Sequence, residues 1–101
     1  MRDIYELFIN RAVEIEEQII KTLVELTGID VDAISRENVH LVKEELLERG
    51  YELIEIIDPT GYKKYELMLN GEKIASGQID VETTNGKEIK LTGSVILHLS
   101  Q

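Results

Sequence analysis

The sequence predicts an α+β fold with two N-terminal helices, the first of them long, followed by a four-stranded antiparallel β-meander curved around that long helix. Two observations lead to this expectation. Apolar residues recur with a period of about 3.6 before Gly50 and with a period of about 2 after it, which marks a change from helix to strand. Asn-Gly pairs at 70–71 and 85–86 are the strongest short signals for β-hairpins.

The first helix is expected from Ile4 to Thr27, with Gly28 ending it. At about 100° per residue, its apolar side chains form one face and an extension, which together span about 200°. The face consists of Ile4, Phe8, Ala12, Ile15, Ile19, Leu23 and Leu26, and the extension of Ile9, Val13, Ile20 and Val24. A surface helix needs an apolar stripe of about 100° or more to cover one core. The broad stripe therefore predicts two packing partners, the sheet and a further surface.

The second helix is expected from about Arg36 to Arg49, because Ser35 is a favourable N-cap and Gly50 a favourable stop. Its apolar side chains are Val39, Val42 and Leu46 on one face, with Leu47 beside them.

Four strands should follow, over residues 51–57, 62–69, 72–82 and 88–100. The first turn, Asp58-Pro59-Thr60-Gly61, has the residues of a type I turn. In the third strand, Ile74 and Ile79 have opposite parity, so one extra residue is needed to turn both inward, and a β-bulge is expected at Ser76-Gly77. In the last strand, Gly93 falls on the core-facing parity, where a missing side chain lets a helix approach closely.

The chain has 101 residues, enough for one domain, with a helical part over about 1–49 and a sheet part over about 50–101. Its net charge is −9. The first 49 residues hold six basic and twelve acidic side chains, which gives −6, and the other 52 hold five and eight, which gives −3. An acidic surface favours solubility, and it also suits a basic protein partner through complementary charge.

The helix-strand-hairpin order of residues 38–71 is shared with winged-helix DNA-binding domains. A duplex-binding surface needs clustered Lys and Arg to displace phosphate counterions. The second helix is net negative, and Lys63 and Lys64 are the only adjacent basic pair in the chain. No nucleic-acid binding is therefore expected.

Groups for catalysis are few. The chain has no cysteine, its only histidines are His40 and His98, and neither lies in a recognisable motif. No glycine-rich phosphate loop is present. We therefore expect no enzyme activity, no catalytic residue, no metal and no cofactor. The first ten residues place acids within an apolar stretch, and no run approaches the roughly 20 apolar residues of a membrane span. A cytoplasmic protein without a membrane segment is expected.

These observations favour a small acidic protein-interaction module that binds a partner protein, as an inhibitor, an immunity or counter-defence factor, or an adaptor. The expected partner-binding residues are Ile9, Val13, Glu16, Ile20 and Val24. Glu16 falls inside the apolar arc, so its carboxylate either reaches water at the edge of the core or is held by a partner. Two alternatives remain open: a self-associating structural or accessory subunit, for instance a homodimer, and a small-ligand binder with a pocket between helix and sheet.

Overall fold

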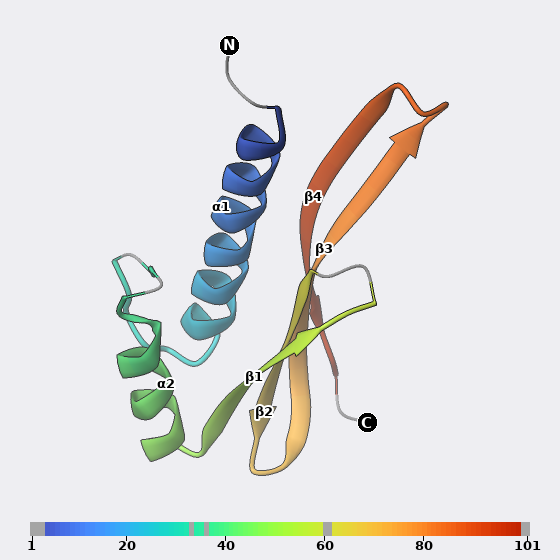
Figure 1. Ribbon diagram of the computed structural model, residues 1–101. Coiled ribbons are helices and arrows are strands. Elements are labelled where there is room, and N and C mark those ends of the chain that lie inside the picture. The colour runs from blue at the N-terminus through green and yellow to red at the C-terminus, as the bar shows by residue number, and fades with distance from the viewer. Residues whose placement is uncertain (1–3, 33, 36, 60–61, 100–101) are drawn as a thin grey trace.

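A computed structural model describes residues 4–32, 34–35, 37–59 and 62–99, and it has the expected α+β arrangement (Figure 1). The elements in chain order are α1 (Ile4–Glu25), α2 (Val39–Glu48), β1 (Tyr51–Ile57), β2 (Lys63–Leu69), β3 (Glu72–Thr84) and β4 (Glu88–Leu97). Helix α1 packs mainly on β3 and β4, whereas α2 packs on β1. The helices thus lie at different parts of the sheet rather than as a pair.

The sheet is an antiparallel meander with the strand order β1-β2-β3-β4. Both Asn-Gly turns have the backbone that the sequence predicts. Asn70 and Asn85 have φ of 52° and 50°, and the glycines that follow them have φ of 84° and 68°. Two successive residues with positive φ define the type I′ turn, whose twist matches that of the strands it joins. Register and hairpin geometry are therefore set locally.

The hydrophobic core lies between α1 and the sheet and continues through the segment between the helices. It consists of Ala12, Ile15, Ile19, Ile20, Leu23, Val24, Ile29, Ile34, Leu46, Leu53, Tyr65, Leu67, Ala75 and Ile79. Helix α1 contributes six of these residues and ends before Gly28, whose φ of 85° suits a helix C-terminus. The only aromatic residue in this set is Tyr65, so the core is aliphatic as its composition requires.

Two glycines of the sheet bring α1 close to the strands. A Cβ atom at Gly93 would lie 2.7 Å from Cγ2 of Ile15, and one at Gly77 would collide with Cγ2 of Ile19. The expectation of a close helix approach at Gly93 is thus supported by the geometry. Gly77 serves the same purpose on the neighbouring strand, since it pairs regularly with Tyr65 and Val95.

Three local predictions need correction. The bulge in β3 lies at Ile74, not at Ser76-Gly77, because Lys73 pairs with Met68 and Ala75 with Leu67, which leaves Ile74 as the extra residue. The opposite parity of Ile74 and Ile79 does require a bulge, and this bulge lies two residues before the expected position. β3 extends to Thr84, two residues past the expected end, and β4 ends at Leu97 rather than residue 100, although the His98 N–H still donates to the Ile74 carbonyl at 2.8 Å.

Helix α2 begins at Val39, three residues later than expected, and Ser35 does not cap it through its side chain. The Ser35 N–H instead donates to Oδ1 of Asn38 at 2.8 Å, and the Ser35 carbonyl accepts from the Val39 N–H at 3.0 Å. A short polar side chain that binds nearby backbone competes with helix formation in this way. Arg36, and Thr60 and Gly61 of the first turn, lie outside the described residues.

Candidate protein-interaction surface

The five residues expected to bind a partner fall into two groups in the structure. Ile9 is exposed, with 58% of its surface accessible, and Val13 and Glu16 are half-buried. Ile20 and Val24 are buried, with only 6% and 0% of their surface accessible. The last two are therefore core residues, and the expectation that they lie on an uncovered surface is wrong. A partner-binding role for the other three stays a prediction.

The burial of Ile20 and Val24 accounts for the width of the apolar stripe on α1. The second packing partner of α1 is the chain itself, since the core that holds both residues includes Ile29, Ile34 and Leu46. A small cavity of about 50 Å³ beside this contact is lined by Val13, Glu16, Glu17, Ile20, Ile34, Ser35, Val39, Glu55, Lys63 and Tyr65. A helical wheel shows how much of a helix is apolar but does not show what covers it.

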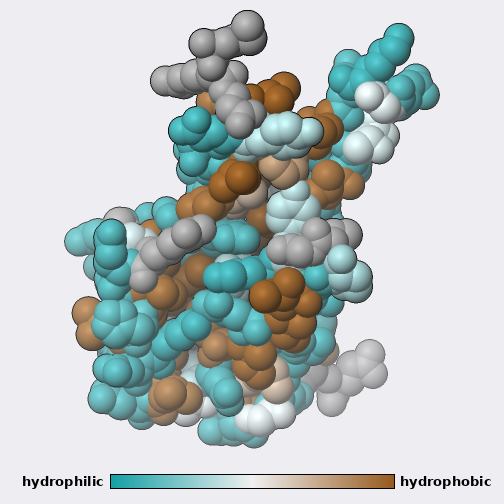
Figure 2. Space-filling view, in the orientation of Figure 1, coloured by the Kyte–Doolittle hydropathy of each residue, from teal (hydrophilic) through white to brown (hydrophobic). Residues whose placement is uncertain are grey.

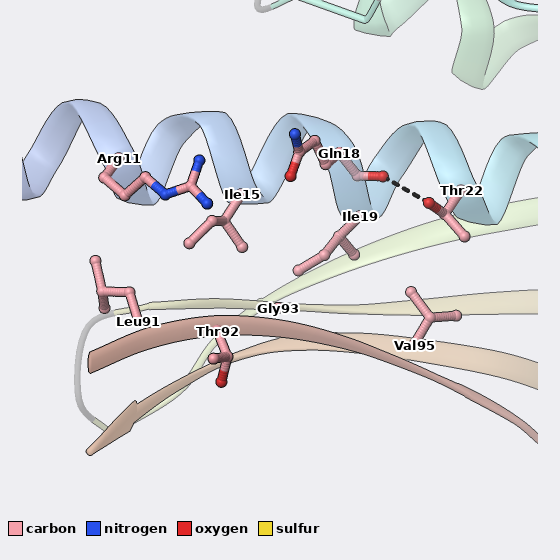
Figure 3. A pocket seen from close by; sticks show the side chains of 9 residues that line it. All are labelled: Arg11, Ile15, Gln18, Ile19, Thr22, Leu91, Thr92, Gly93 and Val95. Carbon is pink, nitrogen blue, oxygen red and sulfur yellow. Dashed lines mark hydrogen bonds between the residues drawn. The ribbon is translucent and has the colours of Figure 1, made fainter.

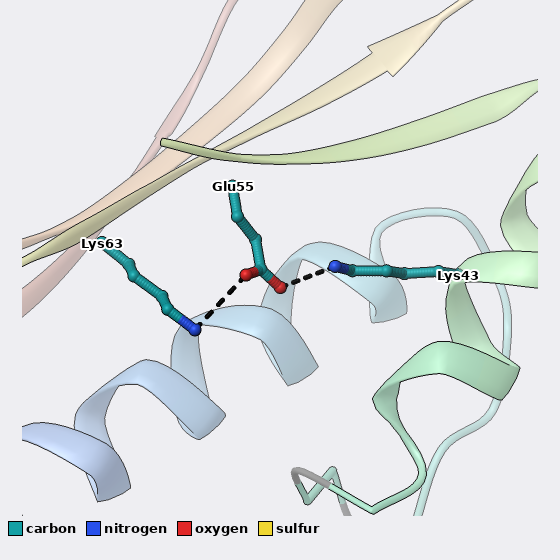
Figure 4. Close-up of polar contacts among 3 residues, drawn as sticks. All are labelled: Lys43, Glu55 and Lys63. Carbon is teal, nitrogen blue, oxygen red and sulfur yellow. Dashed lines mark hydrogen bonds and ion pairs between the residues drawn. The ribbon is translucent and has the colours of Figure 1, made fainter. Parts of the chain in front are cut away.

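Glu16 shares that cavity with a half-buried ion network centred on Glu55 (Figure 4). Nζ of Lys43, on α2, lies 2.7 Å from Oε1 of Glu55, and Nζ of Lys63, on β2, lies 3.3 Å from Oε2. Burial acts to raise the pKa of Glu55, but the hydrogen bonds and charges of the two lysines outweigh it. The pKa of Glu55 therefore lies below its ordinary value of 4.5. The network ties α2 to β1 and β2.

The same network uses a lysine on which the winged-helix alternative depends. Lys63 is engaged by Glu55, and β2, which begins with Lys63 and Lys64, is an internal strand between β1 and β3. Lys64 is half-buried and pairs with Ile56 on one side and Gln78 on the other. Lys63 and Lys64 therefore lie on an internal strand of the sheet rather than at the tip of a wing-like hairpin.

Large apolar side chains are exposed where α1 begins and β4 runs beside it. We call Ile4, Tyr5, Leu7, Ile9 and Ile89 the N-terminal apolar surface. Their accessible fractions are 74%, 74%, 46%, 58% and 63%. Figure 2 shows hydrophobic residues at the upper end of the molecule, where α1 starts. The ring of Phe8 beneath them is half-buried and packs against Tyr62 at a centroid distance of 6.1 Å.

Two hollows lie within this surface. A groove of about 560 Å³ is lined by Ile4, Leu7, Phe8, Arg11, Lys87, Ile89, Lys90 and Leu91, and a more apolar hollow of about 260 Å³ by Ile4, Tyr5, Phe8 and Ile89. Exposed apolar side chains scattered singly are normal, but a contiguous group around a hollow marks a contact site. The sequence pattern missed this surface because Ile89 lies 85 positions after Ile4. The two residues meet only because the β3–β4 hairpin is long enough to reach the start of α1.

The outer face of the sheet, away from α1, carries a polar arrangement that sequence reasoning also missed. Oγ of Ser76 and Nε2 of His98 lie 3.1 Å apart, so His98 is exposed but not an isolated surface residue. A serine paired with a histidine is the nucleophile and base of many hydrolases. Ser76 is 6% accessible on a central strand, flanked by Glu66 and Ile96, and the hollows described above lie on the opposite face. The pair satisfies a buried hydroxyl.

Among the residues that the structure describes, no helix is long and apolar enough to cross a membrane. The same residues contain no group of three or more His, Asp or Glu side chains arranged to hold a metal ion. No protein-family model, curated protein sequence or solved structure matches the chain.

Proposed function

We propose that this chain is a cytoplasmic, non-enzymatic module that binds a partner protein through the N-terminal apolar surface, and that it acts as an inhibitor, an immunity or counter-defence factor, or an adaptor. The observation that supports this most is that four exposed large apolar side chains, those of Ile4, Tyr5, Leu7 and Ile89, line two adjoining hollows. Ile9 lines neither hollow and lies one helical turn from Tyr5 on α1. Hot spots of protein interfaces are large side chains in or beside pockets at the centre of the contact.

Charge around this surface indicates the kind of partner. Over Ile4–Glu25, α1 has five glutamates and two basic residues, which gives −3. Glu14, Glu17 and Asp32 line an open hollow on the flank of α1, with Lys21 as the one basic side chain there. Such a flank steers a basic surface toward the apolar contact and repels acidic ones. The groove of the apolar surface itself is lined by Arg11, Lys87 and Lys90. The proposed partner is therefore a protein whose apolar anchor enters that groove while a basic part of its surface faces the acidic flank of α1.

The proposal is tested by measuring partner capture with surface variants. Immobilised chain is incubated with a lysate of the source, and a retained protein is identified and purified for affinity measurements. Ile4→Ser and Ile9→Ser remove apolar area from the proposed surface, and each is expected to weaken binding about tenfold or more, as at interface hot spots. Leu41→Ser and Leu47→Ser are matched controls, because both leucines are about as exposed as Ile9, at 58% and 60%, but lie on α2.

Added salt should also slow association, since the proposed steering is electrostatic. A partner that binds all four variants with wild-type affinity would place the contact elsewhere. A lysate that yields no stoichiometric partner for wild type would count against the function itself.

A further inference from the structure

The two edges of the sheet differ in how well they are protected. Helix α2 packs on β1, and its Lys43 reaches across to Glu55 on that strand. On the other side, β4 is an edge strand with no described neighbour beyond it, no proline, and a regular register with β3 along its length. Its only charged residues are Glu88 and Lys90, at one end. Natural proteins usually block a free edge with charges, bulges or covering elements.

The backbone of β4 shows which residues present hydrogen-bonding groups at this edge. The N–H of His98 donates to the Ile74 carbonyl of β3 at 2.8 Å. Backbone groups alternate in direction along an antiparallel strand, so the even-numbered residues of β4 point toward β3 and the odd-numbered ones point outward. The outward set is Ile89, Leu91, Gly93, Val95 and Leu97. Five residues thus offer donors and acceptors to another strand.

We propose that a second copy of this chain pairs with β4 in antiparallel orientation, about a two-fold axis at Gly93, and joins two sheets into one of eight strands. In this register Ile89 opposes Leu97 of the second copy, and Leu91 opposes Val95 of the second copy. Ile89 and Leu97 are 63% and 57% exposed in the isolated chain, so pairing covers two large apolar side chains that the fold leaves open.

Cross-strand neighbours favour this register over the adjacent ones. Pairing about Gly93 places Ile89 opposite Leu97 and Leu91 opposite Val95. A shift of the axis to Ser94 would bring Ile89 opposite Leu99, beyond the end of β4, and would place Gly93 opposite Val95. A shift of the axis to Thr92 would bring Lys87 opposite Leu97, so the pair between Ile89 and Leu97 would not form. The edge is therefore self-complementary in one alignment, as a two-fold interface must be.

Helix α1 supports the same arrangement. It packs on β3 and β4 alike, and Figure 3 shows Ile15 and Ile19 pointing from it toward the strand at Gly93. With strands about 4.8 Å apart, a helix between β3 and β4 lies about 4.8 Å from the axis, so the two copies of α1 come about 10 Å apart, a normal helix-packing distance.

The space between those helices already exists as an open groove of about 370 Å³ on the β4 side of α1 (Figure 3). Arg11, Gln18 and Thr22 line its helix wall. Across the axis, α1 of the second copy would face the same wall, so the strand pair gains a second layer.

Sedimentation equilibrium of the purified chain tests the proposal without any other protein. Failure of the dimer is therefore distinguishable from failure of the partner proposed above, although both contacts include Ile89. Wild type is expected to be mostly dimeric at about 0.1 mM and to dissociate on dilution. Ile89→Lys should weaken the dimer, and Ile89→Lys with Leu97→Lys should weaken it further, by about tenfold or more, since two like-charged pairs then meet in each interface. Ile89→Lys with Leu97→Glu should restore the dimer, because each lysine then opposes a glutamate.

Val81→Lys is the matched control. Val81 is 41% exposed on the same face of the same hairpin, but it lies on β3, on the side of the hairpin away from the proposed interface, so this variant should remain dimeric. Circular dichroism confirms that each variant is folded. A monomeric wild type would overturn the proposal, as would a dimer that Ile89→Lys with Leu97→Lys leaves intact. Failure of the charge-swapped variant to recover would rule out the register.

Disulfide trapping tests the register without disturbing the apolar pairs. The chain has no cysteine, so introduced thiols are the only ones present. Thr92 opposes Ser94 of the second copy as a non-hydrogen-bonded pair about 4.5 Å apart between Cα atoms, within disulfide range. A mixture of Thr92→Cys and Ser94→Cys should cross-link on oxidation far faster than either variant alone, because like positions are diagonal and about 7–8 Å apart. Equal rates in all three samples would refute the alignment.

Discussion

Replacing Gly77 with alanine should destabilise the protein, although alanine is the smallest possible addition. The new Cβ atom would collide with Cγ2 of Ile19. Ile19 is 3% accessible and packed between α1 and the sheet, so it has no free space into which to turn. Gly77 lacks a positive φ, so backbone strain does not enter the comparison. The effect therefore isolates the closeness of the helix to the strand.

The magnitude follows from two opposing terms. Adding a methyl group to a packed core costs about 1–3 kcal/mol. Losing a glycine reduces the entropy of the unfolded chain, which returns about 0.4–1 kcal/mol. The net loss should be about 1–2 kcal/mol, or a fall in Tm of about 4–16 °C for a domain of this size. Gly93→Ala should behave similarly, since its Cβ atom would lie 2.7 Å from Cγ2 of Ile15.

Urea unfolding followed by circular dichroism measures this loss, and a double-mutant cycle assigns its cause. Leucine has no Cγ2 branch, so Ile19→Leu removes the atom that Gly77→Ala would strike, at a cost of its own below about 1.5 kcal/mol. The double variant should then be more stable than the sum of the two losses by about 1 kcal/mol. Additive losses, or a Gly77→Ala variant as stable as wild type, would refute the close approach of α1.

Two further predictions concern α2 and its attachment. Because folding lowers the pKa of Glu55, the ionised carboxylate stabilises the folded state above pH 4.5, and this contribution is lost as the pH falls from 4.5 through the lowered value. The urea midpoint of wild type should therefore drop more steeply below pH 4.5 than that of Glu55→Gln, and parallel curves would contradict the ion network. Leu46→Ala should cost about 2–5 kcal/mol because Leu46 is fully buried, whereas Leu47→Ala, at a 60% exposed neighbour, should stay within about 0.5 kcal/mol. Urea unfolding of both variants checks this difference, and equal losses would mean that α2 does not pack through Leu46.

The sequence pattern predicted those parts of the fold that depend on local chemistry. The Asn-Gly turns, the end of α1 at Gly28 and the parity of Gly93 each follow from a few neighbouring residues, and the structure has all of them. The start of α2 was misplaced because Asn38 and Ser35 form a local turn that competes with the helix. The bulge was misplaced because Ile74 and Ser76-Gly77 satisfy the same parity rule, and only cross-strand pairing distinguishes them.

The candidate site was harder to predict because it depends on what covers each surface. Ile20 and Val24 are as apolar as Ile9, and the wheel places all three on one side of α1. The segment between the helices covers the first two and leaves Ile9 exposed. Ile89 joins the N-terminal apolar surface only because the β3–β4 hairpin extends as far as the start of α1. The hydrophobic periodicity of the sequence does not show that distance. Which segment buries a side chain, and how far a hairpin extends, both depend on residues far apart in the sequence.

The unequal lengths of the strands have a dynamic consequence. β3 has 13 residues and β4 has 10, against seven in β1 and in β2, so the far end of the hairpin extends as a two-stranded ribbon in which residues 81–90 are all exposed. An isolated pair of strands is only marginally stable in water. Amide hydrogens of the ribbon should exchange with solvent through local fraying, whereas those of β2 should exchange only when the whole domain unfolds. Binding at Ile89 must order this ribbon, which costs free energy. The measured affinity should therefore depend on how ordered the hairpin tip is in the free protein, as well as on the contacts made at Ile89.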